Sequence, residues 1–117
     1  MIGGNDCRNE VWKGREVFEK DYLNFTKQLL SSLGDDPTKF FILSPPPVYP
    51  QEGKFKDDAG WLSEMNMTAR NEIFSNLYPE MASELNLPGQ NYIDVFAILG
   101  GHNHNRLDLM ADRAHPS

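Results

Sequence analysis

Hydrophobic positions in this 117-residue chain follow helical spacing in two stretches and strand-like runs in two others. Over residues 14–33, apolar side chains recur three or four residues apart, and Gly34 then supplies a stop signal. The recurring side chains are Phe18, Tyr22, Phe25 and Leu29. The spacing predicts an amphipathic helix whose apolar stripe faces the core.

A short and almost uninterrupted apolar run lies at residues 39–44 and ends at three prolines. Such a run predicts a strand that is buried on both faces, as in a parallel sheet. Because proline cannot continue a central strand, the chain should leave the sheet there. Residues 45–60 are therefore expected to form a long surface loop.

Helical spacing returns over residues 62–86, where apolar residues lie four apart. These residues are Met65, Ala69, Ile73, Leu77, Met81 and Leu85. Pro79 interrupts the run and should kink the helix or begin a second one. A second strand is expected over residues 91–96, followed by a polar loop from Gly100.

The alternation of strands and helices predicts an α/β fold with a parallel sheet, in one domain that spans residues 1–117. Ligand sites in such sheets lie beyond the carboxyl ends of the strands. Residues 3–7, 45–49 and 96–115 all follow expected strands, so they should gather at one edge. Only Met1 and Ile2 remain of a strand before the first of these segments, so the domain is expected to be cut there.

Charge and composition narrow the range of partners. The net charge is -6 and the chain has no basic stripe, which argues against binding to nucleic acid or to an anionic membrane. No apolar run is long enough to span a bilayer. The single cysteine, Cys7, excludes an internal disulfide and leaves the compartment undetermined.

The last residues hold the pattern with the most specific chemistry. Asp112 precedes His115 by three residues, so one turn of helix or a tight loop would bring the carboxylate beside the imidazole. The carboxylate would fix one ring nitrogen and leave the other as a base, as in the second half of a Ser-His-Asp hydrolase. The alternative interpretation is an unrelated Asp and His in a polar tail.

A metal site is a second alternative for the same region. Imidazole and carboxylate groups are ligands for zinc, iron or manganese, but a Gly-Gly-His-Asn-His-Asn stretch is also an ordinary polar loop. The candidate ligands are His102, His104, Asp108, Asp112 and His115.

Several blocks, taken together and in order, resemble the SGNH (GDSL-type) hydrolases, in particular the sialate O-acetylesterase-like branch. Gly3-Gly4-Asn5-Asp6 resembles the family's Gly-x-Asn-Asp block, and Asp112-Arg113-Ala114-His115-Pro116 resembles its Asp-x-x-His-Pro block. The chain between them is similar at Trp12, Phe18, Asp21-Tyr22, Ser44-Pro45-Pro46-Pro47 and Tyr92-Ile93-Asp94.

The resemblance implies a three-layer α/β/α fold of SGNH/flavodoxin type and hydrolysis of a small carboxylic ester, with an O-acetyl group as the expected substrate and no cofactor or metal. Asn5 would donate its amide to the oxyanion, and Gly3 would let the backbone make the turn that aims it. His115 would be the general base, and Asp112 would orient it.

The family's Gly-Asp-Ser block, which carries the nucleophilic serine, would lie before Gly3, and a helix would follow Pro116. The resemblance therefore implies a domain truncated at both ends and a chain that is inactive by itself. Cys7 and Ser44 are poor substitutes for the serine, since no group near Cys7 in the sequence would lower its pKa and Ser44 ends a strand before three prolines. A non-catalytic interaction domain is the remaining alternative, with self-association through an exposed sheet edge.

Overall fold

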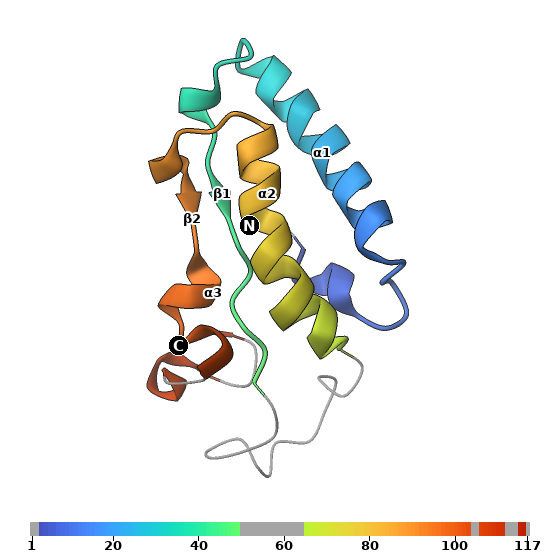
Figure 1. Ribbon diagram of the computed structural model, residues 1–117, viewed down its shortest axis with the longest axis vertical. Coiled ribbons are helices and arrows are strands. Elements are labelled where there is room, and N and C mark those ends of the chain that lie inside the picture. Colours follow the sequence, from blue (N-terminus) through green and yellow to red (C-terminus); the bar gives the residue numbers. More distant parts are fainter. Residues whose placement is uncertain (1–2, 50–64, 104–105, 112–114, 117) are drawn as a thin grey trace.

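The computed structural model describes residues 3–49, 65–103, 106–111 and 115–116. Within these ranges the chain forms a mixed helix and strand structure with a two-stranded parallel sheet (Figure 1). The main elements are α1 (Arg15–Ser32), β1 (Ile42–Leu43), α2 (Phe74–Glu84), β2 (Tyr92–Ile93) and α3 (Val95–Ile98). Single 3₁₀ turns lie at Asn5–Cys7, Pro37–Lys39, Gly89–Asn91, Gly101–Asn103 and Leu107–Leu109.

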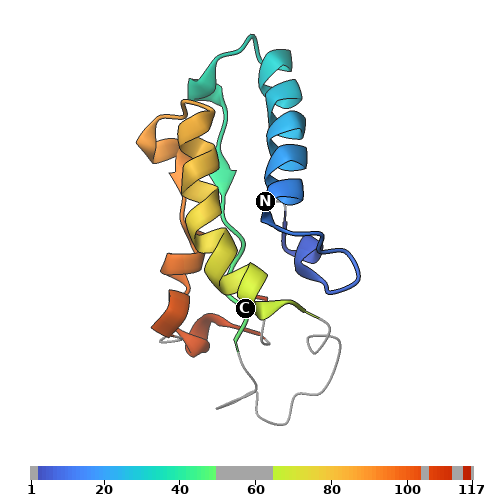
Figure 2. The ribbon, with the colours of Figure 1, turned by 45° about the vertical axis from the view of Figure 1, so that its right-hand side comes forward.

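The two strands confirm the predicted parallel pairing. Ile42 lies opposite Tyr92 and Leu43 opposite Ile93, and the chain passes through α2 between them. Figures 1 and 2 show α1 and α2 running opposite to the strands, as crossover connections require. The mixed helix and strand structure is therefore compatible with the α/β class, whereas the three-layer α/β/α arrangement stays a prediction.

The first predicted helix is confirmed, but its predicted core stripe is only partly right. Tyr22, Leu23 and Thr26 are buried, whereas Phe25 is 46% exposed and Leu29 is 40% exposed. Thr26 can be buried because its hydroxyl donates to the Tyr22 carbonyl at 2.9 Å. The buried face of α1 is thus rotated away from part of the apolar stripe.

A second helix beginning at Pro79 is wrong, because α2 continues through this residue, and the alternative of a kink stays a prediction. Buried side chains lie on both sides of Pro79, at Tyr78 and at Met81, so packing holds the helix across the missing N–H donor. The irregular winding lies upstream instead, in a π-helical turn at Ala69–Ile73 that leads into α2.

Both predicted strands are longer than the observed ones. Phe41 is 55% exposed and lies outside β1, although the sequence predicts a strand buried on both faces. Residues 95–96 were predicted as strand but begin α3. The reason is Asp94, whose carboxylate accepts the Ala97 N–H at 3.0 Å and caps a helix.

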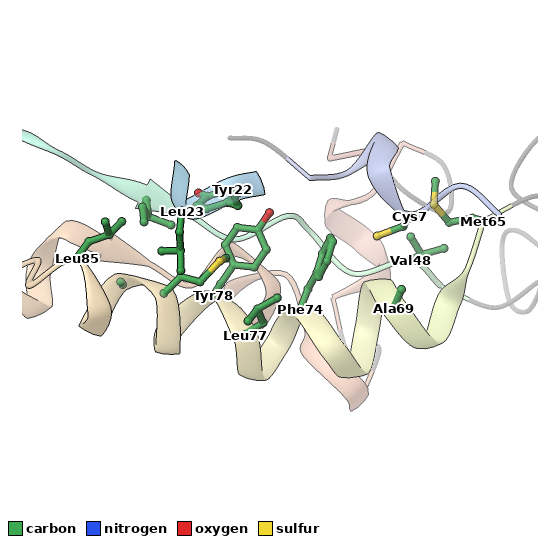
Figure 3. Packing of buried hydrophobic residues seen from close by; sticks show 13 residues of the cluster. Cys7, Tyr22, Leu23, Val48, Met65, Ala69, Phe74, Leu77, Tyr78 and Leu85 are labelled. Atoms are coloured by element: carbon green, nitrogen blue, oxygen red, sulfur yellow. The ribbon is translucent and has the colours of Figure 1, made fainter. Parts of the chain in front are cut away.

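The main core forms where α1, β1 and α2 meet (Figure 3). Aromatic contacts link the N-terminal part of the chain to it, with ring centroids of Phe18 and Phe74 4.6 Å apart and those of Trp12 and Phe74 5.6 Å apart in an edge-to-face arrangement. A smaller cluster near the C-terminus contains Tyr49, Leu99 and Met110.

Candidate functional site

A tight turn at residues 3–7 forms the first part of the candidate site. The Asp6 N–H donates to the Gly3 carbonyl at 3.1 Å, and the Arg8 N–H donates to the Asn5 carbonyl at 3.2 Å. Gly3 has a φ of +114°, and a Cβ at this position would lie 2.0 Å from the Tyr78 hydroxyl oxygen. Glycine is therefore required at position 3 both by the backbone and by the space available.

The same turn presents two polar side chains in opposite ways. Asn5 is exposed, whereas Cys7 is fully buried and its thiol lies 3.6 Å from the Gly3 carbonyl oxygen, to which it donates. Burial raises the pKa of the Cys7 thiol to about 12, more than the nearby Arg70 lowers it. Cys7 therefore stays a protonated core residue at neutral pH and lacks the thiolate that a nucleophile needs.

The segment at residues 44–49, called here the β1 exit segment, carries the chain away from the sheet. Ser44 is buried; its hydroxyl accepts the Phe96 N–H at 3.1 Å and donates to the Asp94 carboxylate at 3.3 Å. These bonds join the two strand ends and leave Ser44 in a structural role. Further along, the Asn71 side chain accepts the Val48 N–H at 2.9 Å and donates to the Val48 carbonyl at 2.7 Å.

Arg70 lies between the turn and the β1 exit segment. Its side chain is 5% exposed, and its Nε donates to the Pro46 carbonyl at 2.8 Å. The guanidinium also contacts the Cys7 thiol, and Nη1 lies 2.7 Å from the position that a Cβ on Gly4 would take. Arg70 was missed at the sequence level, although its four-residue spacing from Phe74 and Tyr78 places it on the buried face.

The predicted catalytic pair lies in the C-terminal segment. His115 is exposed, and its carbonyl accepts the Ala111 N–H at 2.8 Å, while Met110 forms an antiparallel bridge with Pro116. Asp112 lies outside the described residues, so its pairing with His115 stays a prediction. These backbone contacts pair residues 110–111 with residues 115–116, next to the buried Met110.

The direction of the two strands shows how these segments are arranged in space. Figures 1 and 2 show the turn at Asn5–Cys7, the β1 exit segment and the 3₁₀ turn at Leu107–Leu109 in the half of the molecule toward which both strands run. Gly3 and Asn5 thus belong to one turn, whereas His115 belongs to a separate part of the chain, where its backbone pairs with Ala111. This half is where parallel sheets hold their ligands.

An open groove of about 410 Å³ begins beside this turn. Asp6, which follows Asn5 in the turn, is one of its lining residues, and aromatic side chains from α1 and the preceding loop form much of its wall. The lining residues are Asp6, Val11, Trp12, Lys13, Val17, Phe18, Asp21, Tyr22 and Phe25. A small apolar group fits the chemistry of such a surface.

The metal alternative gains no support from the described residues, among which no group of three His, Cys, Asp or Glu side chains could hold an ion. His102 is exposed and packs its ring edge against Phe96, with centroids 4.9 Å apart. His104 and Asp112 fall outside the described ranges. In the described part of the chain, no helix has the length and apolar character needed to cross a membrane.

Comparison of the chain with protein-family models, with curated proteins and with solved structures finds no match. The resemblance to the SGNH hydrolases therefore rests on the sequence blocks alone and stays a prediction.

Proposed function

We propose that this chain carries the oxyanion-binding and general-base part of a carboxylic-ester hydrolase site, with an O-acetyl ester as the substrate class. The observation that supports it most is the turn at residues 3–7, which exposes the Asn5 amide in the half of the fold where strand ends define a ligand site. Gly3 takes a positive φ in this turn, and the buried Cys7 donates to its carbonyl.

The proposed roles follow from the chemistry of each group. The Asn5 amide donates to the carbonyl oxygen as it becomes negative, an interaction that lowers the barrier by about 3 kcal/mol in comparable sites. His115 accepts the proton of the attacking group and returns it to the leaving alcohol, and Asp112 orients its ring. No step in this scheme requires a cofactor. Cys7 and Ser44 are both buried, so neither is assigned as nucleophile.

Binding of a tetrahedral anion tests this proposal without requiring turnover. Methylphosphonate, which resembles the tetrahedral intermediate of ester hydrolysis, should shift the NMR signals of the Asn5 side-chain amide and the His115 ring with one common dissociation constant. Asn5→Ala should weaken binding by about tenfold or more, because it removes one hydrogen bond to a charged group. The matched control is Asn9→Ala at an exposed position close to the turn. Signals that shift with different constants, or not at all, would remove the proposal.

Hydrolysis of p-nitrophenyl acetate tests the assignment of the nucleophile. Because no residue of the chain is assigned that role, we expect no hydrolysis above the buffer rate. Hydrolysis that His115→Ala abolishes would show that a nucleophile is present among residues 1–117, and Cys7→Ala and Ser44→Ala would then identify which of the two candidates acts.

The alternative, a non-catalytic interaction domain, is favoured by the exposed apolar side of α1. Val17, Phe25 and Leu29 are each 40–46% exposed on this helix, and the groove lies beside them. Surfaces of this kind often mark protein contacts. Sedimentation equilibrium separates the two: a monomer that binds methylphosphonate supports the hydrolase site, whereas a dimer that Phe25→Ser dissociates, with no anion binding, supports the interaction domain.

A further inference from the structure

Arg70 is a buried cation without a carboxylate partner among the residues that the structure describes. It lies in the π-helical turn at Ala69–Ile73, and its side chain is 5% exposed. Burial lowers the pKa of its guanidinium. Burying a charged group is costly unless other groups accept its hydrogen bonds, so the contacts of Arg70 matter for its stability.

These contacts join two segments that are far apart in the sequence. From one side, the Pro46 carbonyl in the β1 exit segment accepts the Arg70 Nε–H at 2.8 Å. From the other side, the guanidinium contacts the Cys7 thiol and lies against the Gly4 backbone, where a Cβ would be 2.7 Å from Nη1. One planar group therefore fixes the distance between the turn at residues 3–7 and the β1 exit segment.

The position of Asn5 depends on this arrangement. Gly4 comes directly before Asn5 and Cys7 comes two residues after it, and Arg70 contacts both Gly4 and Cys7. The Asn5 side chain is exposed, and the guanidinium contacts the turn that carries it from the core side. A preorganised donor lowers a reaction barrier only if its supporting contacts keep it aimed.

We infer that Arg70 is a positioning residue that clamps the turn at residues 3–7 to the β1 exit segment and so aims the Asn5 amide. Its role in aiming the amide rests on the proposed hydrolase function, whereas the clamp itself does not. Gly4 contributes to the same arrangement, because any side chain there would push the guanidinium away.

Cys7 supplies a direct reporter of the clamp, since it is the only cysteine and is fully buried. The rate at which Ellman's reagent labels Cys7 in the native full chain measures how often the turn opens. Arg70→Met, which keeps the length of the side chain and removes its charge and donors, should raise this rate by about tenfold or more. Arg70→Lys keeps the charge but cannot bridge both segments, so its rate should fall between the two.

The control is Arg15→Met, which removes an exposed arginine that pairs with Glu80 and should leave the labelling rate unchanged. Repeating the measurement in low urea separates local from global opening. A rate in Arg70→Met that is higher than in wild type and stays constant with urea confirms the clamp, and a rate that rises with the urea dependence of global unfolding overturns it. A rate equal to that of the wild type overturns it as well.

Methylphosphonate titration then tests the aiming role. Arg70→Met should weaken binding by about fivefold or more, with Arg70→Lys restoring part of the loss. If the wild-type protein does not bind methylphosphonate, the proposed hydrolase function fails, and the thiol-labelling result still decides whether the clamp exists. If the wild type binds and Arg70→Met binds equally well, Arg70 does not aim Asn5.

Discussion

Replacing Gly3 with alanine should destabilise the protein through two separate effects. A control variant at a second glycine of the chain lets each effect be measured separately. The first is the backbone: φ is +114°, a region that side chains other than glycine enter at a cost of about 1–3 kcal/mol. The second is space, because the new Cβ would lie 2.0 Å from the Tyr78 hydroxyl oxygen.

The steric cost is large because the neighbours cannot move aside. Tyr78 is fully buried and Phe74 is 1% exposed, and the same Cβ would lie 3.3 Å from the Phe74 ring and 3.2 Å from the Phe18 ring. Overpacking of this kind costs about 1–3 kcal/mol. The total for Gly3→Ala is therefore about 4 kcal/mol, a large part of the stability of a domain of this size.

Gly14 provides the matched control. Its φ is +104°, and no atom lies within 4 Å of the Cβ that Gly14→Ala would add. Gly14→Ala should thus show the backbone cost alone, about 2 kcal/mol less than Gly3→Ala. In a double-mutant cycle, Tyr78→Phe should recover about 1–2 kcal/mol of the Gly3→Ala loss, because it removes the nearest atom.

Urea denaturation followed by circular dichroism measures these differences as shifts in the midpoint at constant slope. The reasoning is refuted if Gly3→Ala is no more destabilising than Gly14→Ala, or if Gly3→Ala and Tyr78→Phe act additively.

Three further predictions concern buried groups. Burial raises the pKa of the Cys7 thiol from 9.0 to about 12, so between these values the unfolded chain loses the proton that the folded chain keeps. The free energy of unfolding should then fall with rising pH. Between about pH 8 and about pH 10.5, it should fall by about 2 kcal/mol more in wild type than in Cys7→Ala. Urea titrations at each pH measure this difference. Asn71→Ala removes two hydrogen bonds to the backbone and should cost about 2–3 kcal/mol in the same titration, against about 0.5 kcal/mol or less for Asn76→Ala at an exposed position. Leu23→Ala should lower the free energy of unfolding by about 3 kcal/mol and Leu29→Ala by less than about 1 kcal/mol, because Leu23 is 9% exposed and Leu29 40%.

Each of these comparisons has a contradicting result. An equal loss of stability at alkaline pH in wild type and in Cys7→Ala would mean that the thiol is not buried. If the two asparagine variants lost the same free energy of unfolding, the hydrogen bonds from Asn71 to the Val48 backbone would not stabilise the protein. If the two leucine variants lost the same free energy, α1 would bury a different face.

The sequence predicted a helix or strand correctly where its hydrophobic spacing and its stop residues indicated the same structure. The helical period over residues 14–33 and the stop at Gly34 correspond to α1, since helix formation there depends on nearby residues. The strand predicted at residues 91–96 ended early because the Asp94 cap outweighed the strand preference of Val95 and Phe96. Whether residues 95–96 form a strand or begin a helix is decided here by a single capping hydrogen bond. The apolar character of these residues does not indicate that bond.

Tertiary packing explains the other differences. The apolar stripe of α1 shows which face of the helix is apolar but not which part of that face packs against the rest of the fold. The exposure of Phe25 therefore could not be anticipated. In the candidate site, the glycine at position 3 was predictable from the turn sequence. Arg70 was not, because a charged side chain is expected at the surface unless its register with buried aromatic residues is given more weight.

The central claim is that the Asn5 amide and the His115 imidazole face one small-molecule site. The most direct measurement is the set of nuclear Overhauser effects between the His115 ring protons and other side chains in the folded protein. We predict cross-peaks from the His115 ring to the Asn5 side-chain amide, or to protons of a bound methylphosphonate that also contacts Asn5. Cross-peaks that place the ring on the opposite face of the molecule, with none to either group, would contradict the account.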